Sequence, residues 1–203
     1  MRKQYLSAPL PFQGQKRMFA KEYIKVLQQF PDGTTFVDLF GGSGLLSHIA
    51  KYQKPNSTVV HNDFDGYRIR LERISQTNKL LEELRTIVDV PRSKPILGEA
   101  RERVLACIRK HEHKYGYVDY ITLSASLLFS MKYATCFADL EKETLYSRVK
   151  STNYPLCTDY LDGLTITSCD YKEVFDKYKD VPNVVFLVDP PYLSTDSKTY
   201  RMY

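Results

Sequence analysis

A strand, a glycine-rich turn and a helix follow one another directly near the start of the chain, and this order constrains the fold most. Residues 35–40 are mainly apolar, aromatic and β-branched, which is typical of a buried strand. Gly41, Gly42 and Gly44 end that strand, and apolar residues then recur at helical spacing from Leu45 to Ala50. Glycines let a backbone approach a ligand closely, and the start of a helix offers free N–H groups. The pattern predicts an α/β protein with a nucleotide-type site, although the loop alone also fits a tight strand-to-helix turn.

Three further strands are predicted at 58–61, 164–168 and 184–188, with helices at 15–30, 66–88, 99–114, 119–137 and 171–179. Right-handed crossovers place the strands in the order three, two, one, four. The tips of strands one and four then meet at the point where the strand order reverses. The predicted division is an α/β domain, residues 1–65 with 164–203, and a mainly helical insert, residues 66–163.

The fourth strand ends in Asp189-Pro190-Pro191-Tyr192. The exocyclic amine of a nucleobase is a poor nucleophile because its lone pair is conjugated into the ring. Acceptors on its two hydrogens, the Asp189 carboxylate and the Pro190 carbonyl, would direct that lone pair outward, and proline keeps its carbonyl out of a regular hydrogen-bond ladder. Tyr192 can stack on the base. The same tetrapeptide also fits a plain turn after a strand.

Together these motifs resemble those of the Dam-type DNA adenine-N6 methyltransferases. The shared elements run in that family's order along the chain: Pro11-Phe12-Gln13-Gly14-Gln15-Lys16, Asp38-Leu39-Phe40-Gly41-Gly42-Ser43-Gly44, Asn62-Asp63, Ser168-Cys169-Asp170-Tyr171 and Asp189-Pro190-Pro191-Tyr192. The resemblance implies a Rossmann-like, S-adenosylmethionine-dependent methyltransferase sheet that modifies adenine N6 of a flipped base in double-stranded DNA.

The resemblance makes residues 1–65 with 164–203 the cofactor-binding and catalytic domain, and residues 66–163 the target-recognition insert. It also assigns roles to residues. The catalytic group is Asp189, Pro190, Pro191 and Tyr192. The residues expected to bind S-adenosylmethionine are Phe12, Gly14, Lys16, Asp38, Phe40, Gly41, Gly42, Gly44, Asp63 and Asp170. Among these, Asp63 is expected on the ribose, as an acid at the tip of the second strand, and Asp170 on the adenine edge.

The insert mixes cations, an amide and aromatic rings of the kinds that contact phosphates and base edges. The residues expected to bind DNA are Lys132, Tyr133, Arg148, Lys150 and Asn153. For each one, an ordinary surface or core position in a helical subdomain is the alternative.

Charge and composition agree with this function. The net charge is +5; residues 1–31 hold six basic and one acidic side chain, whereas residues 32–65 hold two basic and four acidic. A basic arm suits a phosphate backbone, and an acidic cofactor region suits a sulfonium. We expect a cytoplasmic protein with reduced cysteines, no membrane span and no metal, because the four cysteines are far apart and His111-Glu112-His113 has the wrong spacing for a helical site.

The sequence stops at Tyr203, soon after the catalytic motif, whereas the sheet of the resembling family continues. We therefore expect a truncated sheet, and a protein that is either monomeric or self-associating through its exposed edge. Three alternatives stay open: an rRNA guanine-N2 methyltransferase, a non-catalytic remnant that binds cofactor or DNA, and, least supported, a nicotinamide oxidoreductase.

Overall fold

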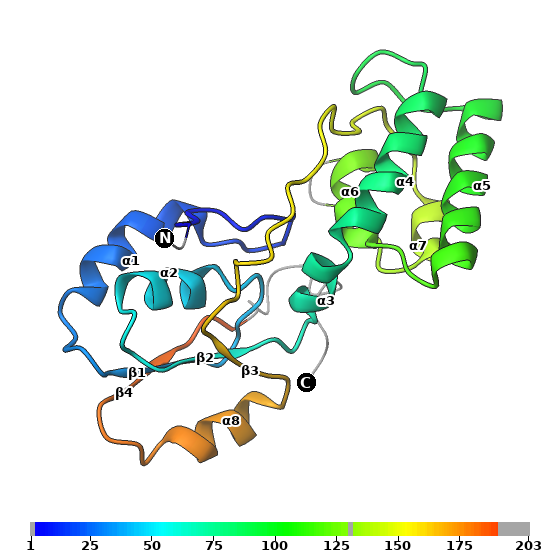
Figure 1. Ribbon diagram of the computed structural model, residues 1–203. Helices are drawn as coiled ribbons and strands as arrows, with labels where there is room; N and C mark the ends of the chain where they lie inside the picture. The colour runs from blue at the N-terminus through cyan, green and yellow to red at the C-terminus, as the bar shows by residue number, and fades with distance from the viewer. Residues whose placement is uncertain (1–2, 130–131, 191–203) are drawn as a thin grey trace. The chain divides into compact units, whose positions relative to one another are not determined.

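The computed structural model describes residues 3–129 and 132–190, and the chain forms two compact units (Figure 1). The first unit comprises residues up to Leu71 and from Cys157 onward; the second runs from Glu72 to Leu156. The sequence places the boundaries slightly differently, after residue 65 and before residue 164. The intervening segments group with the first unit because Tyr67 and Tyr160 are fully buried in it.

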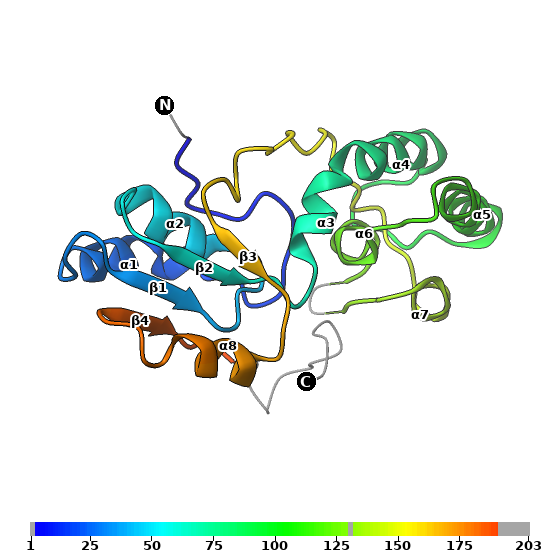
Figure 2. The same ribbon diagram turned by 60° about the horizontal axis from the view of Figure 1, so that its bottom comes forward.

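Within the described residues, the first unit holds a parallel sheet in the order β3-β2-β1-β4 (Figures 1 and 2). The strands are β1 (Thr35–Asp38), β2 (Val59–Asn62), β3 (Thr165–Thr167) and β4 (Val184–Leu187). The predicted strand order and the Rossmann-like class are confirmed. In the β1–β4 pair, Asp38 is in register with Leu187, so both strands end at the same edge of the sheet.

Helices cover both faces of this sheet, as expected for parallel strands buried on two sides. One face packs on α1 (Ala20–Leu27), which follows the short η1 (Arg17–Phe19), and on α2 (Leu45–Gln53). The other face packs on α8 (Tyr171–Tyr178), where Val174 meets Val37 and Val60 (Figure 2). Alternate residues of β1 thus point into two different cores, and the strand holds its register because a slip would exchange them.

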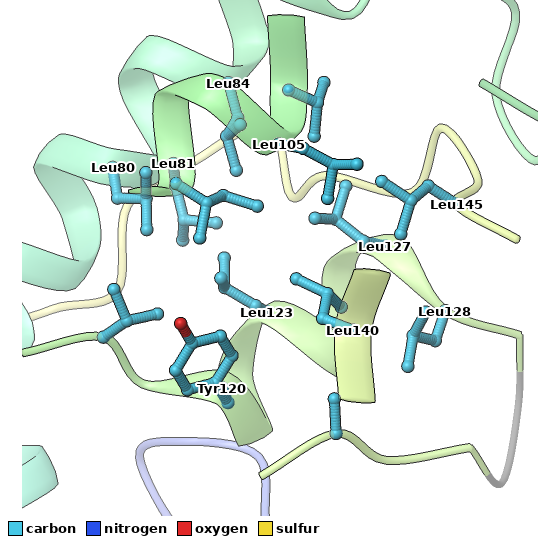
Figure 3. Packing of buried hydrophobic residues seen from close by; sticks show 14 of the residues in the cluster. Leu80, Leu81, Leu84, Leu105, Tyr120, Leu123, Leu127, Leu128, Leu140 and Leu145 are labelled. Carbon is cyan, nitrogen blue, oxygen red and sulfur yellow. The ribbon is translucent and has the colours of Figure 1, made fainter. Parts of the chain in front are cut away.

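The second unit is helical and has its own core (Figure 3). Its helices are α4 (Ile74–Ile87), α5 (Gly98–Tyr115), α6 (Tyr120–Leu127) and α7 (Phe137–Lys142). Leucines from all four helices meet in this core, with Leu80, Leu84, Leu123 and Leu140 each at most 1% exposed. A dedicated core of this kind is what a separately folding insert needs.

Three predicted helices are shorter in the structure. The 15–30 stretch is α-helical only from Ala20 to Leu27, after the short η1. The 66–88 stretch is divided at Arg73 into α3 (Tyr67–Glu72) and α4. The 119–137 stretch ends as a helix at Leu127, because Leu128 is extended and the Ser124 hydroxyl accepts a hydrogen bond from the Ala134 backbone. Periodicity cannot reveal such a break, since apolar residues continue on both sides of it.

Candidate functional site

The candidate site lies at the edge where β1 and β4 end. The Leu39 N–H donates to the Leu187 carbonyl at 3.2 Å, extending the pairing of the two strands to their tips. Asp38 is the last residue of β1, and Asp189 follows β4 by two residues. Burial is the largest cause of the raised pKa of Asp38, and the negative charge of Asp189 raises it further, so the two carboxyl groups are electrostatic neighbours. The predicted meeting of these two loop tips is what the structure shows.

The glycine loop is shaped by close contacts on two sides. A Cβ on Gly41 would lie 2.3 Å from the His61 ring and 2.7 Å from the Asn62 carbonyl oxygen. A Cβ on Gly42 would lie 2.9 Å from the Phe12 ring, and Gly44 has a φ of 71°. The loop therefore requires glycine for its backbone to lie against β2 on one side and Phe12 on the other.

Beneath this loop is a buried polar network that sequence reasoning missed. Ser47 of α2 donates to Asp38 at 2.7 Å, and its hydroxyl oxygen is 3.2 Å from Nδ1 of His61. Burial raises the pKa of Asp38 to about 6, opposed by the Ser47 hydrogen bond and reinforced by Asp189. Burial lowers the pKa of His61 to about 4. His61 is therefore neutral near pH 7, and its 3.9 Å approach to Asp63 is not an ion pair.

Asn62 and Asp63, at the tip of β2, make several backbone contacts. The Asn62 amide donates to the carbonyls of Leu39 and Cys169, both at 3.0 Å, and accepts from the Cys169 N–H at 3.1 Å. It thereby joins the ends of β1 and β2 to the segment after β3. Asp63 accepts from the backbone N–H groups of Tyr67 at 2.6 Å and Arg68 at 3.1 Å, so its carboxylate caps α3. Its expected role on a ribose stays a prediction.

The N-terminal motif reaches the same edge. Lys16 pairs with Asp189 at 2.6 Å and donates to the Gly14 carbonyl at 3.0 Å. The Phe12 ring meets Tyr67 edge-on, with centroids 5.8 Å apart. The structure thus brings Phe12, Gly14 and Lys16 to the glycine loop and Asp189.

Phe40 and Asp170 lie on the α8 side of the edge. The Phe40 ring lies 5.0 Å from that of Tyr171, and Asp170 caps α8 by accepting from the Lys172 N–H at 2.8 Å. Of the predicted catalytic tetrapeptide, Asp189 is half-buried and Pro190 is exposed. Pro191 and Tyr192 lie outside the described residues.

The residues predicted to bind DNA have partners within the second unit. Lys132 pairs with Glu143, and Arg148 donates to the Leu128 carbonyl at 3.0 Å. Lys150 lies 4.4 Å from the Tyr154 ring centroid. Asn153 accepts from Arg85 at 2.9 Å, and Tyr133 is half-buried. Any role of these side chains on DNA stays a prediction, and it would require them to share or exchange these partners.

The D12 class N6 adenine-specific DNA methyltransferase family matches residues 12–203. The chain belongs to this family. The resemblance to the Dam-type enzymes is thereby confirmed. A protein of Haemophilus influenzae (strain ATCC 51907 / DSM 11121 / KW20 / Rd) named "Putative methyltransferase" is 37% identical over 206 residues, covering 98% of this chain and 69% of the relative.

Family and relative together identify the chain as a methyltransferase. In the described part of the chain, no helix is both long and apolar enough to cross a membrane. The same residues contain no group of three or more histidine, cysteine or acidic side chains placed to hold a metal ion.

Proposed function

We propose that this methyltransferase transfers a methyl group from S-adenosylmethionine to N6 of adenine in double-stranded DNA. The observation that carries the proposal is the position of Asp189, held at the tip of β4 beside the glycine loop and the tip of β1. An acceptor for the target amine and a close-approach loop for the cofactor thus share one edge.

The residues at this edge fit the cofactor. The glycine loop leads into α2, whose start at Gly44 has no side-chain cap, so backbone N–H groups there can receive a carboxylate. Phe12 lies against Gly42 and offers an apolar surface for part of the ligand. Gly41, Gly42, Phe12 and Asp170 are the residues we expect to hold it, with Asp63 near the ribose. When bound, S-adenosylmethionine supplies an electrophilic methyl group on a positively charged sulfur.

The protein then has to orient a weak nucleophile. The adenine amine is paired and stacked in a duplex, so the base must leave the helix, at a cost of a few kcal/mol. The Asp189 carboxylate accepts a hydrogen bond from one amine hydrogen, and the Pro190 carbonyl accepts a hydrogen bond from the other. Together they direct the nitrogen lone pair toward the methyl group. With S-adenosylmethionine bound, its methyl group would pass to this nitrogen, S-adenosylhomocysteine would leave, and the proton lost by the amine would pass to solvent. Alignment and preorganised acceptors account for the rate acceleration.

The test is incubation of the protein with methyl-labelled cofactor and plasmid DNA, followed by nucleoside analysis. The expected product is N6-methyladenine. Label in ribosomal RNA guanine, with none in DNA, would overturn the proposal in favour of the RNA enzyme. Cofactor binding by calorimetry with no labelled product would favour a non-catalytic protein.

The role of Asp189 is tested with Asp189→Ala, which should abolish methyl transfer while changing cofactor affinity by only a few-fold. Asp176→Ala is the matched control, because Asp176 is 66% exposed on α8 and pairs with Lys179, which is itself 45% exposed. Equal loss of binding and turnover in Asp189→Ala would show that the carboxylate belongs to the cofactor pocket instead.

A further inference from the structure

The segment 10–16, here called the N-terminal strap, is fixed in place by α3. The Tyr67 hydroxyl accepts a hydrogen bond from the Leu10 N–H at 2.9 Å and donates to the Leu10 carbonyl at 3.1 Å. Arg70 donates to the Pro11 carbonyl at 2.7 Å. Tyr67 is 0% exposed, so these bonds are shielded from water. The strap is therefore held at a defined position relative to the sheet.

Lys16, at the end of the strap, forms an ion pair with Asp189. Its Nζ lies 2.6 Å from Oδ2 of Asp189, and it also donates to the Gly14 carbonyl. The two side chains are only 22% and 26% exposed. Such a charge-assisted hydrogen bond is short and directional, and partial burial reduces its screening by salt. The pair fixes one oxygen of the carboxylate.

The positive charge of Lys16 also affects the electrostatics of the two acidic side chains at this edge. Asp38 is 2% exposed at the tip of the adjacent strand, and the charge of Asp189 acts on it. Two carboxylates so placed repel one another, which favours protonation of one of them. Lys16 offsets the negative charge of Asp189 through their ion pair and so reduces this repulsion.

We propose that Lys16 is a positioning residue for Asp189: it holds Oδ2 so that the other carboxylate oxygen faces the target amine. The inference rests on the proposed function and deepens it. It gives Lys16 a role different from the cofactor contact that the family resemblance implies, because the strap ends on the acceptor for the amine.

The two roles are separated by steady-state kinetics of methyl transfer to plasmid DNA. Lys16→Met should lower kcat by roughly 10- to 100-fold, as expected for a misplaced catalytic group, while KM for S-adenosylmethionine stays within about 3-fold. Lys16→Arg should restore most of kcat because it keeps the charge and the donors. Lys25→Met is the matched control, since Lys25 forms an exposed pair with Glu22 at 73% and 69% exposure. A raised KM with unchanged kcat would make Lys16 a cofactor ligand and overturn the inference, as would unchanged kinetics.

A second measurement, of thermal stability, does not depend on methyl transfer. It therefore distinguishes failure of this inference from failure of the proposed function. Lys16→Met should lower Tm by roughly 2–4 °C, the shift for about 1 kcal/mol in a chain of this size. In an Asp189→Asn background the same change should have at most half that effect, because its partner charge is gone. Equal shifts in both backgrounds would overturn the pairing. If the wild-type protein leaves DNA adenine unmethylated, the proposed function fails, whereas the thermal comparison still reports on the pair.

Discussion

The two buried residues Asp38 and His61 should each make the free energy of unfolding depend on pH, in opposite directions. Burial raises the pKa of Asp38 from 3.8 to about 6, so its contribution to stability is full below pH 3.8 and is lost as pH rises through 6. Burial lowers the pKa of His61 from 6.5 to about 4, so its contribution is full above pH 6.5 and is lost as pH falls through 4.

At about 1.4 kcal/mol per pKa unit, each shift corresponds to about 3 kcal/mol. Because the signs are opposite and the windows overlap, the two contributions largely cancel in the wild-type protein between pH 4 and 6.5. Substituting either residue should therefore reveal the pH dependence that the other one contributes. His61→Asn keeps a donor near the Ser47 hydroxyl but cannot titrate, whereas Asp38→Asn removes the buried carboxyl.

The assay is urea unfolding followed by circular dichroism at several pH values from 4 to 7.5. The free energy of unfolding of His61→Asn minus that of the wild-type protein should rise by about 3 kcal/mol on acidification. The corresponding difference for Asp38→Asn should fall by about 3 kcal/mol. A loss of stability that is independent of pH does not affect this comparison, because only the change of the difference with pH is measured.

His113→Asn is the matched control, since His113 is exposed on α5, and its difference from the wild-type protein should change little with pH. Differences that are independent of pH for both His61→Asn and Asp38→Asn would refute the reasoning, because neither buried group would then titrate as burial requires.

Two further predictions concern the packing of the edge. Gly41→Ala should lower the free energy of unfolding by about 1–3 kcal/mol, because its Cβ would overlap the buried His61 ring and the Asn62 carbonyl; unchanged urea unfolding would mean that the loop moves away freely. Asn62→Ala should cost about 3 kcal/mol, about 1 for each of three backbone hydrogen bonds; a loss below about 1 kcal/mol in the same assay would show that Leu39 and Cys169 find other partners.

The sheet could be predicted because its determinants are local. Each strand is a short apolar run with a turn signal after it, and the handedness of crossovers fixes the strand order. The glycine loop and Asp189 were therefore placed at one edge from sequence alone. The break at Arg73 carries no local signal in the sequence, because neither proline nor glycine marks it.

The partners of the predicted residues could not be read from sequence, because contacts across the fold carry no local signal. Lys16 and Asp189 are far apart in the sequence, and they meet because the N-terminal strap is bound to α3 and β4 pairs with β1. Ser47 and His61 were missed because a serine on a helix and a histidine at a strand end are common, and only burial gives them a role. For Asp63, an acid after a strand suits either a ligand or a helix cap, and the structure shows the cap.

The two tyrosines that flank the helical unit in sequence have a wider consequence. Tyr67 precedes the point where the chain leaves the first unit, and Tyr160 follows the point where it returns. Both are fully buried, and their rings lie 6.3 Å apart. A stretch whose ends meet at neighbouring anchors can be swapped as a cassette with little strain on its host. Replacing that cassette alone would therefore test whether the second unit selects the target sequence in the proposed reaction.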